Sequence, residues 1–139
     1  MTTSTATPAT RPTSRVGHRA LWVLQILMGV FFVVASAAPK FIGDPYAVEI
    51  FTEIGAGQWF RYVVGALELA GGIGLMVPRL AGPAAVGLMA LMIGAGYTQA
   101  VVLDAPAMLT SPAVFFVLAA VIAWGRRASI TAWIPGRNH

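Results

Sequence analysis

The stretch GALELAGGIGLMVP, residues 65–78, is apolar and rich in glycine, ends at a proline and carries a single carboxylate, Glu68. A chain of 139 residues is expected to form one domain. It is 58% hydrophobic and only 10% charged, whereas soluble domains carry roughly 25% charged residues. So few charges cannot cover a surface in water, and we therefore expect lipid to be the solvent around this stretch.

Four apolar segments make up most of the chain. They are ALWVLQILMGVFFVVASAAP (20–39), YVVGALELAGGIGLMVP (62–78), LAGPAAVGLMALMIGAGYTQAVVL (80–103) and a last one from Ala107 to Trp124. A spanning helix needs about 20 residues. The first and third segments are long enough. The second spans if its ends snorkel or the bilayer thins, and the fourth spans only if it begins before Pro112. The sequence thus predicts an all-α fold, a bundle of four transmembrane helices.

The ends of the chain differ in composition from this bundle. Residues 1–18 are rich in Thr, Ser and Pro and are predicted to be a disordered cytoplasmic tail. Residues 19–125 are assigned to the bundle, and residues 126–139 to a second cytoplasmic tail. Little more than Arg79 separates the second and third segments, which predicts a tight antiparallel helical hairpin.

The connection between the first and second segments has the signals of a short helix. Asp44 can act as the N-cap, with Pro45 at the first helical position and Gly55 and Gly57 at the end. We expect a short amphipathic helix here, lying on the outer membrane face. An irregular extracellular loop is the alternative.

The basic residues fall mainly on one side of the predicted bundle. With four spans, one side holds seven of them: Arg11, Arg15, Arg19, Arg79, Arg126, Arg127 and Arg137. The other side holds Lys40 and Arg61. The positive-inside rule then places both termini in the cytoplasm. A cleaved signal peptide ending at Ala35-Ser36-Ala37 is the alternative; it would leave three spans and would still place Arg79 inside.

Composition also excludes several kinds of chemistry. The chain has no cysteine, so disulfides, thiolate nucleophiles and iron–sulfur ligation are excluded. Its two histidines lie in the predicted tails, and no metal site is expected. The net charge of +4 does not indicate nucleic-acid binding, because no basic cluster exceeds two adjacent arginines and no aromatic residues alternate with them.

Glu68 lies near the predicted bilayer midplane, where a charged group costs on the order of 3 kcal/mol and needs a partner. The candidates are Lys40, Arg61, and Gln99 or Tyr97, all on the extracytoplasmic side of the midplane. We expect a polar pocket that opens outward between the first three helices. Gln25, near the cytoplasmic end of the first helix, lies at a different depth in the predicted bilayer from this pocket.

The glycines of the second segment predict close helix packing. A helical wheel places Arg61, Val64, Gly65, Gly71, Gly72 and Leu75 on the face of Glu68, and Ala66, Ala70 and Gly74 in a separate row. Small residues let helix backbones approach closely in a membrane. With two such faces, this helix is predicted to be central, with Gly65, Gly71, Gly72 and Gly74 as its packing residues. Glu68 then has three open roles: a buried pair that fixes register, a ligand, proton or quinone site, or a contact within a homo-oligomer.

A family pattern also emerges. The order FFVVASAAPKF, then FTEIGAGQWFRYVVGALELAGGIGLMVPRLAGPAAVGLMALMIGAGYTQAVV, then a last apolar helix, resembles the DoxX-like family of small bacterial membrane proteins. The motif positions are occupied by Lys40, Gly55, Gly65, Glu68, Gly71 or Gly72, Pro78 and Arg79. The chain departs from the family pattern at Ala35-Ser36-Ala37 and Thr98-Gln99. Over roughly residues 19–125, the resemblance implies a four-helix bundle in the bacterial cytoplasmic (inner) membrane.

Some relatives are membrane subunits of sulfur-compound:quinone oxidoreductases, and others are linked to oxidative-stress or thiol-redox assemblies. The resemblance thus implies a redox-linked membrane subunit that binds a quinone-like or small amphipathic ligand, or anchors a soluble or membrane redox partner. Without cysteine, the chain cannot itself carry dithiol chemistry, and any quinone would be bound without a covalent link. Two alternatives are a small proton-coupled transporter and a non-catalytic membrane scaffold that recruits a soluble partner through its basic inner face.

Overall fold

The computed structural model of the protein describes residues 15–135, which form helices and turns and contain no strand. The first rod is continuous and consists of α1 (Arg15–Val30), the π-helix η1 (Phe31–Ala37) and α2 (Ala38–Ile42). The remaining elements are α3 (Pro45–Ile54), α4 (Gln58–Leu75), α5 (Ala81–Tyr97), the π-helix η2 (Thr98–Val102), the 3-10 turn η3 (Pro106–Leu109), α6 (Thr110–Gly125) and α7 (Arg127–Thr131). The prediction of an all-α fold is confirmed.

Three helical stretches among the described residues are long and apolar enough to cross a membrane: Arg15–Ile42, Ala81–Val102 and Pro106–Gly125. They leave large apolar side chains exposed, among them Leu27, Ile93 and Val117. A surface of this kind is suited to lipid rather than to water. The second predicted span, now α4, is not among the three, and it carries Gln58, Arg61 and Glu68.

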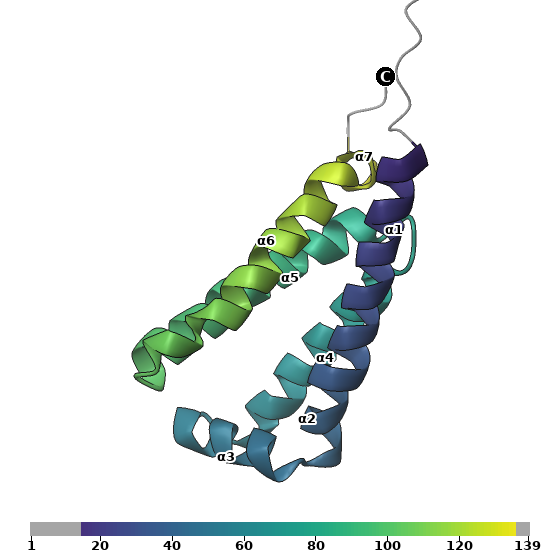
Figure 1. Ribbon diagram of the computed structural model, residues 1–139. Coiled ribbons are helices and arrows are strands. Elements are labelled where there is room, and N and C mark those ends of the chain that lie inside the picture. The colour runs from purple at the N-terminus through teal and green to yellow at the C-terminus, as the bar shows by residue number, and fades with distance from the viewer. Residues whose placement is uncertain (1–14, 136–139) are drawn as a thin grey trace, which may run out of the picture.

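The helices form two pairs that diverge from one end of the molecule (Figure 1). The first rod lies beside α4, and α5 lies beside α6. The pairs lie close together where α1 begins and α7 lies, and they spread apart toward α3. The core between them is built from all four long elements: Met28, Phe32, Leu75, Ala85, Leu88, Met92, Ala119 and Ile122.

Glycines bring α4 into close contact with its neighbours on two sides. A Cβ atom placed on Gly72 would lie 2.8 Å from the carbonyl oxygen of Gly29, and one on Gly29 would lie 2.7 Å from the carbonyl oxygen of Gly72. Gly65 faces Lys40 and Phe41 on the same side. On the other side, Gly71 faces Leu88 and Gly74 faces Ala84, both on α5. Thus α4 lies between the first rod and α5.

The beginning of α3 follows from local chemistry. The Asp44 side chain accepts a hydrogen bond from the backbone N–H of Tyr46 at 3.2 Å, and Pro45 occupies the first turn. At the other end, Gly55 takes the left-handed conformation with φ of 79°, which glycine adopts without steric cost. Ala47 and Phe51 are buried, so α3 turns an apolar face toward the rest of the bundle.

The structure also locates the ends of the first and last long helices. α6 begins at Thr110, before Pro112, which meets the condition that the sequence set for a fourth apolar span. α1 begins at Arg15, so residues 15–18 are helical and do not belong to a disordered tail. Within this part of α1, Trp22 Nε1 donates to His18 Nε2 at 3.1 Å, one turn away. The rest of the predicted N-terminal tail, residues 1–14, and residues 136–139 lie outside the described residues.

Candidate functional site

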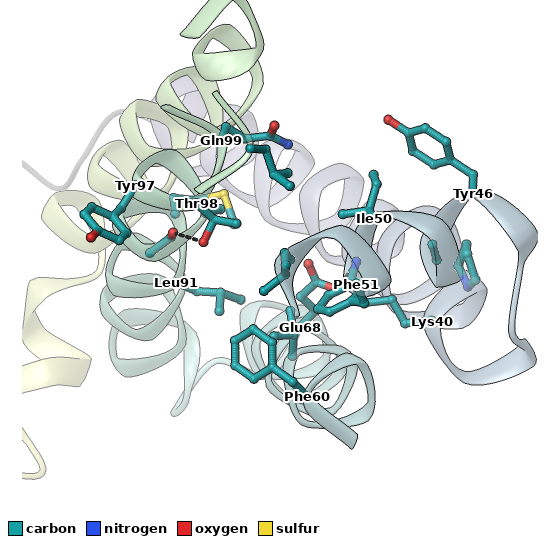
Figure 2. Close-up of a pocket in the computed structure, with 18 of the residues that line it drawn as sticks. Lys40, Tyr46, Ile50, Phe51, Phe60, Glu68, Leu91, Tyr97, Thr98 and Gln99 are labelled. Atoms are coloured by element: carbon teal, nitrogen blue, oxygen red, sulfur yellow. Dashed lines mark hydrogen bonds and ion pairs between the residues drawn. The ribbon is translucent and has the colours of Figure 1, made fainter. Parts of the chain in front are cut away.

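A pocket of about 530 Å³ lies between α2, α3 and α4 on one side and the end of α5 with η2 on the other (Figure 2). Most of its wall is apolar and includes Ile50, Phe51, Phe60, Val64, Leu91 and Met92. Four residues that the sequence singled out also line it: Lys40, Glu68, Tyr97 and Gln99. Arg61, the fifth candidate, is not part of the wall.

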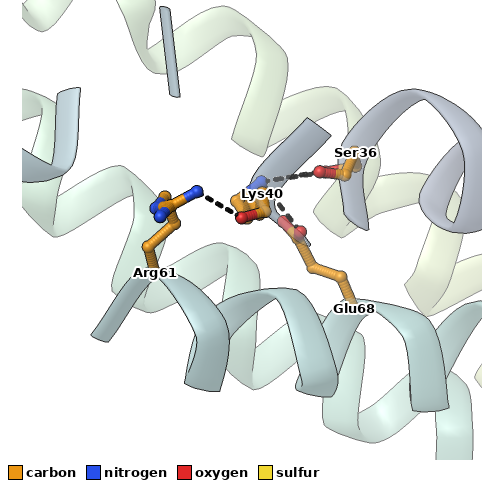
Figure 3. Close-up of polar contacts among 4 residues, drawn as sticks. All are labelled: Ser36, Lys40, Arg61 and Glu68. Atoms are coloured by element: carbon orange, nitrogen blue, oxygen red, sulfur yellow. Dashed lines mark hydrogen bonds and ion pairs between the residues drawn. The ribbon is translucent and has the colours of Figure 1, made fainter. Parts of the chain in front are cut away.

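Glu68 lies on the α4 face that is turned into the protein, and only 5% of the residue is exposed. Its Oε2 atom is 2.8 Å from Lys40 Nζ (Figure 3). The ammonium group also donates to the carbonyl oxygen of Ser36 at 3.0 Å and to its hydroxyl oxygen at 3.4 Å. The ion pair therefore joins α4 to the end of the first rod, beside the pocket.

Arg61 is equally buried, but it does not pair with Glu68. Its Nε donates to Gln58 Oε1 at 2.9 Å, Nη1 donates to the carbonyl oxygen of Lys40, and Nη2 donates to the Tyr62 hydroxyl at 3.2 Å. Figure 3 shows the guanidinium on the opposite side of Lys40 from the carboxylate. Of the two cations that the sequence offered to Glu68, Lys40 is thus the partner. Arg61 holds the backbone that positions Lys40.

The remaining candidates lie toward the edge of the pocket. Tyr97 is exposed, whereas Thr98 and Gln99 are half-buried. In Figure 2, Leu91 approaches Glu68 from α5, and Phe51 and Lys40 lie on the other side of the carboxylate. The sequence did not identify α3 as a wall of the site. The signal that could have identified it is the spacing of Ala47 and Phe51, which lie four residues apart on the buried face of α3.

The π-helix η2 contributes to the pocket wall, and the π-helix η1 contacts the wall residue Lys40. In η1 the backbone N–H of Ala38 bonds to the carbonyl oxygen of Val33, and in η2 that of Leu103 bonds to Thr98 at 2.9 Å, in each case five residues back. Ser36, which holds Lys40, belongs to η1, and Gln99 belongs to η2. Such widened turns are frequent at functional sites. Neither was predicted from the sequence.

A second buried polar cluster joins α1 to the ends of α4 and α6, away from the pocket. Gln25 is fully buried; its Nε2 donates to the carbonyl oxygen of Leu75 at 2.8 Å, and its Oε1 accepts from Arg126 Nε at 2.7 Å. Arg126 Nη1 lies 3.2 Å from His18 Nδ1. Burial of the guanidinium lowers the pKa of Arg126 from its ordinary value. We call this set the Gln25 cluster, and the set of Ser36, Lys40, Arg61 and Glu68 the Glu68 cluster.

Neither cluster resembles a metal centre, because no three His, Asp or Glu side chains in residues 15–135 converge to hold an ion. The fold and the site instead define a multi-pass helical membrane protein with one ion pair beside an apolar pocket. The model of the DoxX-like family matches residues 23–122, from within α1 to within α6, and the chain belongs to this family. No curated protein and no solved structure matched it. The resemblance seen in the sequence is confirmed.

Proposed function

We propose that this protein is a redox-linked membrane subunit whose pocket binds a quinone-like or other small amphipathic molecule, or through which it anchors a redox partner. The observation that carries the proposal is the buried Glu68–Lys40 pair on the wall of an apolar pocket of about 530 Å³. Ligand sites typically measure about 300–1,000 Å³ and combine apolar walls with a few polar groups. An ion pair that only fixed helix register would need no such space beside it.

The arrangement suits a molecule with a polar head and an apolar body. The head would lie at the carboxylate, and the body would lie against Phe51, Phe60 and Leu91. An ionisable residue within a membrane protein often marks a path for a substrate or a proton. Redox chemistry of a quinone requires both electrons and protons, and Glu68 would serve such a ligand as a hydrogen-bonding or proton-exchanging group.

We also propose that the chain crosses the membrane four times, and that α4 crosses it in addition to the three helical stretches named above. Its 18 residues reach about 27 Å at 1.5 Å per residue, close to the hydrocarbon thickness of about 30 Å. Arg61 and Glu68 point into the protein, while Val63, Leu67 and Ile73 are exposed. The charges that make α4 less apolar than the other spans would therefore not face lipid. In this arrangement α3 lies on the outer face.

Orientation is proposed from three arginine–tryptophan contacts. Arg126 lies over Trp22 at 5.3 Å from the ring centroid, Arg127 lies over Trp124 at 4.6 Å, and Arg79 lies over Trp133 at 5.8 Å. Arg79 lies between α4 and α5, and Arg126 and Arg127 lie where α6 meets α7. These segments are at the end of the molecule where the two helix pairs converge (Figure 1). Basic residues favour the cytoplasmic side, and tryptophans favour the interface. We place this end, and both termini, in the cytoplasm of a cell whose inner membrane holds the protein.

Because the chain has no cysteine, single cysteines can test this orientation. Ala56→Cys lies between α3 and α4, and Ala128→Cys lies in α7; both positions are exposed. A membrane-impermeant maleimide applied to intact spheroplasts should label the first and spare the second until the membrane is opened. Labelling of both in sealed spheroplasts, or of Ala128→Cys alone, would contradict the proposed topology.

The chain offers a matched pair of variants for the pocket itself. A Cβ atom on Gly94 or on Gly87 would meet nothing within 4 Å, and both glycines lie on α5. Gly94 lines the pocket, whereas Gly87 does not. Gly94→Leu should therefore fill the pocket without a clash, and Gly87→Leu adds the same side chain elsewhere. The wild type and both variants would be purified in native lipid, and their bound small molecules identified by mass spectrometry.

We expect an amphipathic molecule, such as a quinone, to be retained by the wild type and Gly87→Leu and lost from Gly94→Leu. Equal amounts in all three would show that the molecule is bulk lipid and would contradict the proposal. A wild type that carries no small molecule but retains a stoichiometric soluble protein would favour the scaffold alternative instead.

A further inference from the structure

We infer that the buried end of the pocket selects a hydrogen-bond donor, so that the ligand presents a hydroxyl group to Glu68 rather than a carbonyl or an ether. This inference rests on the proposed function and specifies the chemical form of the ligand. It starts from the polar residues that are buried in residues 15–135, which are Gln25, Arg61 and Glu68. Of these three, Glu68 alone lines the pocket.

Glu68 has acceptor capacity that the protein does not use. An ionised carboxylate only accepts hydrogen bonds, and it offers about four lone-pair sites. Within the described part of the chain, its polar contact is the Lys40 ammonium at 2.8 Å from Oε2. This contact occupies one of those sites, and no donor in residues 15–135 reaches the others. A buried acceptor without a donor is costly, and a ligand hydroxyl would supply the donor.

The cations around Glu68 have no donor left for a ligand. Lys40 Nζ carries three protons. Three oxygens already lie within 3.4 Å of it: the carbonyl and hydroxyl oxygens of Ser36 and Oε2 of Glu68. Arg61 directs its guanidinium to Gln58, Tyr62 and the backbone of Lys40, and it does not line the pocket. A carbonyl head next to Glu68 would therefore set one acceptor against another.

The other polar groups of the pocket discriminate little between donors and acceptors. The Asp44 carboxylate accepts from the backbone N–H of Tyr46, and the Thr98 hydroxyl donates to the carbonyl oxygen of Gly94 at 2.9 Å. Tyr97 and Gln99 can both donate and accept. The buried carboxylate thus determines the preference. The ligand class is an apolar molecule with a phenol-like hydroxyl head, and for a quinone-like pair it is the hydroquinone form.

Para-decylphenol and its methyl ether make a redox-inert test pair, because they share an apolar body and differ in the donor. Both would be titrated calorimetrically into the full chain in nanodiscs of phosphatidylcholine, using the wild type, Gly94→Leu and Glu68→Gln. Gly94→Leu reports partition into lipid, which is subtracted. We expect the wild type to bind the phenol about tenfold more tightly than the ether or better, since hydrogen bonds to charged groups are the stronger ones. In Glu68→Gln this ratio should fall toward one.

The outcomes separate the two proposals. Equal affinity of the wild type for both compounds, with both lost in Gly94→Leu, would overturn the donor preference and leave the pocket in place. Tighter binding of the ether would overturn the preference as well. If neither compound binds beyond the Gly94→Leu background, the proposed function fails too. If Glu68→Gln does not fold, the affinities of the wild type for the two compounds still test the donor preference.

Discussion

The Gln25 cluster and the Glu68 cluster both bury polar groups where the first rod meets α4, but at opposite ends of that contact. In the Gln25 cluster the side-chain amide donates to the carbonyl oxygen of Leu75 and accepts from Arg126. Gln25 does not line the pocket. In the Glu68 cluster the carboxylate has one close cation, unused lone pairs and a pocket beside it. Burial and charge alone do not distinguish the two.

The difference shows what separates a structural contact from a binding site inside a membrane protein. Both arrangements offset the cost of a polar group in an apolar surrounding. The Gln25 cluster leaves one buried atom, Arg126 Nη2, without a partner among the described residues, but neither Gln25 nor Arg126 lines the pocket. The Glu68 cluster also offsets this cost only in part, and it has room for a ligand next to the carboxylate. We therefore expect damage to the first to reduce stability and damage to the second to reduce binding.

The largest effect should come from a change that disturbs both clusters together. Gly72→Ala would place a methyl group 2.8 Å from the carbonyl oxygen of Gly29, a backbone atom that cannot rotate away. The clash would push α1 away from α4 and strain both clusters. We expect it to lower the free energy of unfolding by about 3 kcal/mol. Unfolding by SDS in mixed micelles measures this. Gly87→Ala, where a Cβ meets nothing within 4 Å, is the control and should stay within about 0.5 kcal/mol.

The next largest effect should fall on the Gln25 cluster alone. Gln25→Leu leaves the guanidinium of Arg126 and the carbonyl oxygen of Leu75 without their buried partner. We expect a loss of about 2 kcal/mol in the same unfolding assay. The affinity of the folded protein for para-decylphenol should be unchanged. A stable Gln25→Leu variant that binds the phenol weakly would reverse the roles given to the two clusters.

Glu68→Gln should show the opposite pattern. Lys40 keeps its two hydrogen bonds to Ser36, and the amide oxygen still fits beside it, so we expect about 1 kcal/mol or less of lost stability. Phenol affinity should fall about tenfold, because a neutral acceptor replaces a charged one. The comparison between the clusters fails if this variant loses more stability than Gln25→Leu while it keeps its affinity.

Tyr97→Phe should have the smallest effect. Tyr97 lines the pocket, but its side chain is exposed, so water can replace any hydrogen bond that its hydroxyl makes to a ligand. We expect less than about a twofold change in phenol affinity and no measurable change in unfolding. A tenfold loss in the calorimetric titration would move the polar head of the ligand from Glu68 to the pocket edge.

The sequence predicted the part of the site that depends on one helix. The 3.6-residue period placed Glu68 on the face with Gly65 and Gly72, and the cost of a charge in lipid indicated a cationic partner such as Lys40. These inferences need only the regular geometry of α4. The first and third apolar segments were equally plain, because a run of apolar residues identifies a candidate span whatever surrounds it. The fourth was conditional, because it depended on a helix that begins before Pro112.

The remainder depends on how helices meet, which the pattern of one segment does not contain. The bond between Gln25 and Arg126 joins residues 101 positions apart. The choice of Lys40 over Arg61 depends on where the first rod ends beside α4, and the π-helices widen that rod and the end of α5 at particular turns. Whether α4 spans the membrane stays a prediction, since its charges lower its hydropathy and only their inward direction makes a span acceptable.

The order of the pocket walls along the chain has a consequence for biosynthesis. Lys40 and Glu68 both precede Arg79, whereas the wall formed by α5 and η2 follows it. The ion pair can thus form in the emerging chain before the second wall exists, so the carboxylate would enter the bilayer already neutralised. Insertion of α4 from a nascent chain stopped after Arg79, scored by glycosylation mapping, should therefore be less efficient with Lys40→Met. Equal insertion would show that the pair assembles only after translocation.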